Sequence, residues 1–153
     1  MPEPRQEAEA QAQLEEFDVD GPRVGIVMGS ESDMKMMEKA AHELEERGIP
    51  HESRVMSAHR EPDVVAEYSK TARMRGVRVI IAGAGISAAL PGAVAAHTDL
   101  PVIGVPLTSR LTAAGGLDAI LSIVQMPPGV PVACVGLDNP RNAAILAVQI
   151  LGS

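Results

Sequence analysis

Short, uniformly apolar runs alternate along the chain with longer segments in which apolar residues recur every three or four positions. A run that is apolar throughout is typical of a strand buried on both faces of a parallel sheet, and the longer spacing predicts helices between the strands. In the first such helix Met34, Met37 and Leu44 follow this spacing. The predicted strands are 23–28, 52–56, 77–82, 102–105 and 132–135, and the predicted helices are 33–47, 62–75, 90–97, 117–125 and 142–151.

The alternation of five strands with five helices predicts one α/β domain. Its expected architecture is a three-layer, doubly wound parallel sheet with the flavodoxin-like strand order 2-1-3-4-5. We place this domain at residues 22–153, because Gly21-Pro22 interrupts the chain just before the first strand. Residues 1–21 are predicted to form an acidic, flexible leader, since they are rich in Glu, Gln and Ala and lack a wide apolar stripe.

Charge and composition exclude several classes of protein function. Residues 1–20 carry −6 of the net charge of −7, so the predicted domain is nearly neutral and has no basic patch. The whole chain has no Trp, one Tyr and one Phe, so it also lacks the stacking platform of many nucleic-acid-binding proteins. A single Cys excludes a disulfide framework, and the spacing of His42, His51 and His97 fits no metal site. Without an apolar run of membrane-spanning length, we expect a cytoplasmic protein that binds neither nucleic acid nor membrane.

Ligands of doubly wound sheets bind outside the carboxyl ends of the strands, so the loops after the first three strands are the candidate site. In the first loop, Ser30 and Ser32 offer hydroxyls beside the free N–H groups of a helix start, which favour a phosphate. Asp33 can accept hydrogen bonds from sugar hydroxyls. Ser and Asp are also ordinary helix caps, and from this loop alone a cap is the simpler interpretation.

The second and third loops carry different chemistry. The second contains His59, a residue type that moves protons near neutral pH, and Arg60, which can hold a phosphate through two parallel hydrogen bonds. The alternative is an ordinary loop histidine beside a surface arginine. The third loop, residues 83–92, consists largely of small residues that let the backbone approach a flat ligand closely, although a tight strand-to-helix turn would use the same residues.

Five motifs occur in order along the chain. They are Met28-Gly29-Ser30-Glu31-Ser32-Asp33, Ser57-Ala58-His59-Arg60-Glu61-Pro62, Ala82-Gly83-Ala84-Gly85 with Leu90-Pro91-Gly92, Pro101-Val102-Ile103-Gly104-Val105-Pro106, and Ser122-Ile123-Val124-Gln125-Met126-Pro127. Together they cover roughly residues 23–151, and in this combination the chain resembles the PurE family of purine biosynthesis.

The resemblance implies an N5-carboxyaminoimidazole ribonucleotide mutase. Such an enzyme moves a carboxylate from the exocyclic nitrogen of its nucleotide to ring carbon four, without metal or organic cofactor. The nucleotide and CO2 are then the small-molecule partners, His59 is the general acid/base, and a homo-octamer is the implied assembly. The implied substrate-binding residues are Ser30, Ser32, Asp33, Ser57, Ala58, Arg60, Gly83, Ala84, Gly85, Ser87 and Leu90.

Two departures from the family pattern bear on these expectations. Class I bacterial members commonly have Gly-Ala-Ala-His-Leu-Pro-Gly in the third loop, whereas this chain has Ala89 in the histidine position. Direct carboxylation of aminoimidazole ribonucleotide with CO2 is therefore the alternative activity, and a non-catalytic nucleotide-binding homologue is a further alternative. Many members also continue beyond Ser153 with a helix that packs on a neighbouring subunit, which leaves the number of subunits open.

Overall fold

The computed structural model describes residues 21–153, and all ten predicted strands and helices are present there with shifted ends. The strands are β1 (Val24–Met28), β2 (His51–Val55), β3 (Val79–Gly85), β4 (Val102–Leu107) and β5 (Ala133–Cys134). The helices are α2 (Met34–Glu46), α3 (Pro62–Thr71), α4 (Leu90–Ala95), α5 (Leu117–Val124) and α6 (Pro140–Leu151). Short 3-10 helices are η1 (Glu31–Asp33), η2 (Arg73–Arg75) and η3 (Ala114–Gly116). Apart from Gly21, the predicted leader lies outside the described residues.

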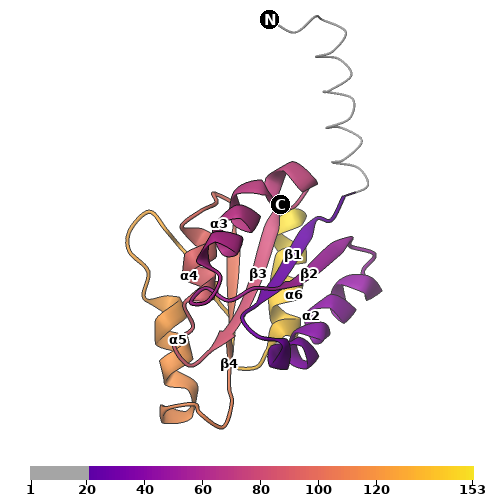
Figure 1. The fold of residues 1–153 in the computed structure, drawn as a ribbon. Coiled ribbons are helices and arrows are strands. Elements are labelled where there is room, and N and C mark those ends of the chain that lie inside the picture. Colours follow the sequence, from indigo (N-terminus) through magenta and orange to yellow (C-terminus); the bar gives the residue numbers. More distant parts are fainter. Residues whose placement is uncertain (1–20) are drawn as a thin grey trace, which may run out of the picture.

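The strands form one parallel sheet in the order β2-β1-β3-β4-β5, which confirms the predicted topology. Helices α3, α4 and α5 pack on one face, and α2 and α6 pack on the other (Figure 1). The chain therefore has the three-layer, doubly wound α/β architecture expected from its alternating pattern. Since all strands are parallel, their carboxyl ends lie at one edge of the sheet.

Strand β3 extends three residues beyond its predicted end, which corrects the sequence-based boundary. Gly83, Ala84 and Gly85 belong to the strand, where they pair with Val105, Pro106 and Leu107 of β4. A Cβ atom on Gly85 would lie 2.7 Å from the carbonyl oxygen of Leu107, so a glycine permits this close pairing. Glycine has a low intrinsic strand preference, and here the tertiary pairing overrides it.

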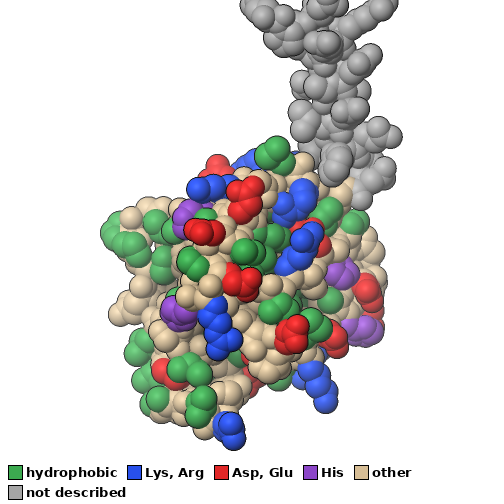
Figure 2. Space-filling view, viewed as in Figure 1, with side chains coloured by type: hydrophobic (Ala, Val, Ile, Leu, Met, Phe, Trp, Pro, Cys, Tyr) green, Lys and Arg blue, Asp and Glu red, His purple; other side chains and the backbone are tan. Residues whose placement is uncertain are grey.

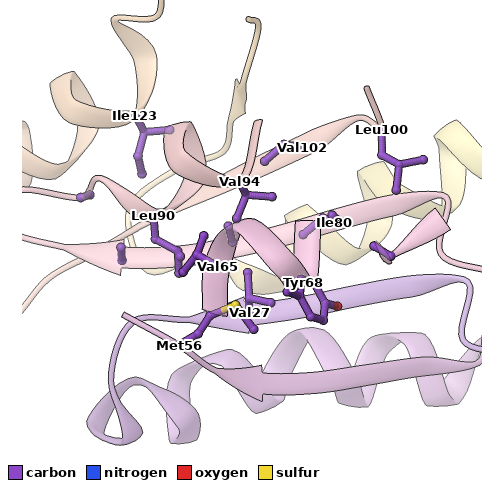
Figure 3. Close-up of a cluster of buried hydrophobic side chains, with 14 of the residues drawn as sticks. Val27, Met56, Val65, Tyr68, Ile80, Leu90, Val94, Leu100, Val102 and Ile123 are labelled. Atoms are coloured by element: carbon purple, nitrogen blue, oxygen red, sulfur yellow. The ribbon is translucent and has the colours of Figure 1, made fainter. Parts of the chain in front are cut away.

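Alternate residues of the central strands supply two separate hydrophobic cores, because successive strand side chains point to opposite faces. On one face Ile80 packs in a cluster with Val65 of α3 and Ile123 of α5 (Figure 3). On the other face the next residue, Ile81, packs in a cluster with Met37 of α2. The two cores cover the faces of the sheet and leave its carboxyl-terminal edge to the loops.

The surface agrees with the near-neutral charge of the domain. Acidic, basic and apolar side chains are intermixed on the face seen in Figure 2, and no large patch of one sign is visible there. Within residues 21–153, no helix is long and apolar enough to cross a membrane.

Candidate active site

Four loops meet around a cavity of about 490 Å³ at the carboxyl-terminal edge of the sheet. They follow β1, β2, β3 and β4, which are neighbours in the sheet. Eleven of the twelve residues predicted for the site line this cavity. The exception is Gly83, which lies inside β3, where an added Cβ would be 2.5 Å from the sulfur of Met37. Its lack of a side chain is therefore explained by the packing of α2 on β3.

The sequence allowed two interpretations of the loop after β1, a helix cap or a ligand-binding loop, and the structure is consistent with both. The Ser30 hydroxyl oxygen caps η1 by accepting a hydrogen bond from the backbone N–H of Ser32, at 3.3 Å. The two serine hydroxyl oxygens also lie 2.9 Å apart, within hydrogen-bond distance. Since both serines line the cavity, the same hydroxyls that shape the loop are available to a ligand.

Asp33 is half-buried at the end of this loop. Its carboxylate has no hydrogen-bond or ion-pair partner among the described residues. Burial raises the pKa of this carboxyl group above its ordinary value, because removal from water disfavours the charged form. An unpartnered acceptor in a ligand-sized cavity is suited to bind hydroxyl groups.

The loop after β2 is a tight turn organised by Ser57. The backbone N–H of Arg60 donates to the Ser57 hydroxyl oxygen at 3.2 Å, and the N–H of Glu61 donates to the Ser57 carbonyl at 2.8 Å. Pro62 then begins α3, at a position where a helix needs no N–H donor. The turn places His59 and Arg60 in the cavity lining.

His59 differs from the other three histidines. His42 contacts Glu46, His51 contacts the carbonyl of Ile49, and His97 contacts the carbonyl of Ala93. These interactions hold three imidazole rings in structural roles. The His59 ring has no such partner among the described residues and lines the cavity, so both of its nitrogens remain available to a ligand.

The loop between β3 and α4 forms the apolar and small-residue side of the cavity. Ile86 lies here with a backbone φ of 58°, in the left-handed region that β-branched residues rarely adopt. Its side chain is 45% exposed and lines the cavity. Ser87 and Ala89 line it as well, and the N–H of Ala89 donates to the Ser87 carbonyl at 2.8 Å.

The loop after β4 was not expected in the site. Its residues Thr108, Ser109, Arg110 and Leu111 line the cavity beside those of the other three loops. Asp138 anchors the start of this loop, since its carboxylate accepts hydrogen bonds from both the backbone N–H and the hydroxyl of Thr108. These residues match no motif. The predicted strand order places β4 beside β3, so the loop after β4 could have been predicted to lie at the site from the strand order alone.

The cavity offers serine hydroxyls, a free carboxylate, a free imidazole and two arginines to one ligand. In the part of the chain that the structure describes, no group of three or more His, Cys, Asp or Glu residues could hold a metal ion. These features define a doubly wound α/β protein with a polar small-molecule site at the switch between its two sheet halves.

Comparison with known proteins specifies the family. The AIR carboxylase family, where AIR is aminoimidazole ribonucleotide, matches residues 23–153, and the chain belongs to this family. The N5-carboxyaminoimidazole ribonucleotide mutase of Thermotoga maritima is 60% identical over 132 residues, covering 86% of this chain and 75% of that protein. The mutase of Pyrococcus horikoshii is 58% identical over 131 residues, covering 86% and 73%. The crystal structure of Treponema denticola PurE superposes with a TM-score of 0.74 at 36% identity, covering 86% and 80%.

Proposed function

We propose that this chain is the isomerase of de novo purine biosynthesis that converts N5-carboxyaminoimidazole ribonucleotide into 4-carboxyaminoimidazole ribonucleotide. The observation that carries the proposal is the free His59 imidazole in one cavity with the unpartnered Asp33 and Arg60. The mutases of Thermotoga maritima and Pyrococcus horikoshii support the same activity, because they are about 60% identical over most of this chain.

The reaction needs one group that gives and then accepts a proton. Protonated His59 donates its proton to the exocyclic nitrogen as the nitrogen–carboxylate bond breaks, which leaves CO2 and the neutral amine. Ring carbon four then attacks CO2 and forms the new carbon–carbon bond. Neutral His59 removes the proton from carbon four, which restores the aromatic ring and the starting protonation state. The electron-rich aminoimidazole supplies the electrons, so the proposed reaction needs no organic cofactor or metal.

The other lining residues have roles that follow from their chemistry. Arg60 binds the phosphate, because a guanidinium can make two parallel hydrogen bonds to it. Asp33 accepts hydrogen bonds from the ribose hydroxyls. The hydroxyls of Ser30, Ser32 and Ser57 complete the polar contacts, while Ala58, Ala84, Gly85, Ser87 and Leu90 surround the ring and keep CO2 from escaping into water.

Two substrates distinguish this function from its alternative. Purified protein is supplied with N5-carboxyaminoimidazole ribonucleotide without bicarbonate, and separately with aminoimidazole ribonucleotide plus bicarbonate. We expect fast conversion of the first and slow conversion of the second. Conversion of the first substrate no faster than its spontaneous decay would refute the mutase activity. Fast conversion of only the second would indicate direct carboxylation, the alternative that Ala89 in the cavity lining leaves open.

We also propose that the chain acts as a homo-octamer in the cytoplasm. Exposed apolar side chains on α5 support self-association: Leu117, Leu121 and Val124 are each nearly half exposed. The number of subunits comes from the family resemblance, and the cytoplasmic location stays a sequence-based prediction.

A further inference from the structure

The arginines of the described residues differ in whether a carboxylate contacts their side chains. Most contact a carboxylate: Arg47 and Arg141 contact Glu43, Arg54 and Arg75 contact Glu52, and Arg73 contacts Asp99. Arg60 and Arg110 have no hydrogen bond or ion pair through their side chains with any described residue. Both line the cavity, and apart from His59 they are its only basic side chains within residues 21–153.

These two free arginines enter the cavity from different sides. Arg60 follows β2 and Arg110 follows β4, and the sheet order places β1 and β3 between those strands. Because neighbouring strands lie about 4.8 Å apart, the two loops start roughly 14 Å from each other. The loops after β1 and β3, which carry Asp33 and Ile86, occupy the space between them.

We propose that Arg110 binds the migrating carboxylate of the nucleotide while Arg60 binds its phosphate, an assignment that rests on the proposed function. The substrate and the product each carry two anionic groups at opposite ends, the phosphate on the ribose and the carboxylate on the aminoimidazole. Two arginines on loops at opposite sides of one cavity can each meet one of these anionic groups. His59 is occupied with the proton, so Arg110 is the remaining cation that can hold the carboxylate through two hydrogen bonds.

This assignment makes a specific kinetic prediction. The carboxylate is present in both substrate and product but is absent while CO2 is free. Arg110 therefore stabilises both bound nucleotides and contributes little to the attack of carbon four on CO2. Replacing it should raise KM more than it lowers kcat, because most of the lost interaction is already present in the bound substrate.

Calorimetric titration with two ligands tests the proposal without relying on turnover. The ligands are 4-carboxyaminoimidazole ribonucleotide and aminoimidazole ribonucleotide, which differ only in the carboxylate. We expect Arg110→Gln to weaken binding of the carboxylated ligand about tenfold and to leave the other nearly unchanged. Arg60→Gln should weaken both. Arg54→Gln removes the same charge from an exposed arginine outside the cavity and should change neither.

Every other pattern overturns the assignment. Equal weakening of both ligands by Arg110→Gln would place Arg110 at the phosphate, and no weakening would remove it from the site. Arg110→Lys keeps the charge and should restore part of the lost affinity, which guards against a folding defect in the glutamine variant. If the wild-type protein binds neither nucleotide, the proposed function fails instead, and this outcome is distinct from an effect of Arg110.

Discussion

His59 is the residue whose replacement should separate catalysis from binding. His59→Asn keeps a polar side chain of similar size but cannot give and take the proton, so we expect turnover to fall by about 10²–10⁴-fold. Binding of aminoimidazole ribonucleotide should remain nearly unchanged, since the proposed phosphate and ribose contacts are elsewhere. Steady-state kinetics and calorimetric titration measure the two effects. Unchanged turnover would refute the role of His59, and His42→Asn is a matched control outside the cavity.

Asp33 illustrates a conflict between stability and binding. Burial raises the pKa of Asp33 above 3.8, so the folded protein holds this proton more tightly than the unfolded chain does. By linkage, the contribution of Asp33 to the free energy of unfolding falls as the pH rises from 3.8 through the raised pKa. Above that range the half-buried, deprotonated carboxylate continues to destabilise the folded state. Asp33→Asn should therefore raise Tm at neutral pH, and the gain should shrink as pH is lowered toward 3.8.

The same variant should bind substrate less well. The loss of a charged acceptor for ribose hydroxyls is expected to raise KM by about tenfold. Because Asp33 is only half-buried, the stability gain should stay below about 1 kcal/mol. Thermal melting across pH and steady-state kinetics measure both effects, with the exposed Glu67→Gln as control. A lower Tm at neutral pH would contradict the burial argument.

Ile86 allows backbone strain to be separated from side-chain function. Its left-handed φ of 58° costs about 1–2 kcal/mol in a non-glycine residue. Ile86→Gly removes that cost but adds flexibility worth about 0.5–1 kcal/mol, so we expect a small rise in Tm. Ile86→Ala keeps the strain and should not raise Tm. If the side chain helps to retain CO2, both variants should lose carboxylated product to free aminoimidazole ribonucleotide, and product analysis measures this loss.

At the scale of elements, Gly83 tests whether a glycine is present for packing or for binding. An added Cβ would meet the Met37 sulfur at 2.5 Å, so Gly83→Ala should loosen α2 from β3 and destabilise the protein by about 1–3 kcal/mol. KM should be unchanged, because Gly83 does not line the cavity. Denaturant unfolding gives the free energy. In a Met37→Ala background, Gly83→Ala should lower the free energy of unfolding by less. An equal loss of free energy in both backgrounds would argue against this contact.

The elements also show what could be predicted from the sequence and what could not. Uniformly apolar strands alternating with amphipathic helices were enough to predict the strand order and three of the four loops around the cavity. The end of β3 was misplaced because glycines signal turns locally, while in the sheet Gly85 pairs with Leu107. The loop after β4 was missed because Thr108 to Leu111 match no motif and reach the cavity only through the order of strands. The left-handed backbone of Ile86 runs against its residue type, and only the fold requires it.

At the scale of the whole molecule, charge is unevenly distributed along the chain. Most of the net charge of −7 belongs to residues 1–20, so the domain that forms the cavity is nearly neutral. An anionic nucleotide therefore meets little overall repulsion, and local cations decide its orientation. Within residues 21–153 those cations are Arg60 and Arg110, the two cavity arginines without carboxylate partners.

We expect the whole molecule to self-associate through an exposed apolar face of α5. Leu117, Leu121 and Val124 are spaced by four and three residues, so they share one face of α5, and each is 47–48% exposed. An apolar face of this kind is costly in water unless another subunit covers it. The preceding loop contributes Leu111, which is 66% exposed and lines the cavity, so assembly and catalysis should be coupled.

Light scattering across a range of protein concentrations tests this coupling. We expect an octamer for the wild-type protein and a smaller species for Leu121→Lys, because a buried lysine would leave its charge without water or partner. Turnover should fall together with the mass, since the cavity loop next to α5 loses its covering subunit. Val64→Lys introduces the same charge at a 46% exposed position of α3 and serves as the control. A wild-type monomer at every concentration, or equal behaviour of the two lysine variants, would show that α5 is not the interface.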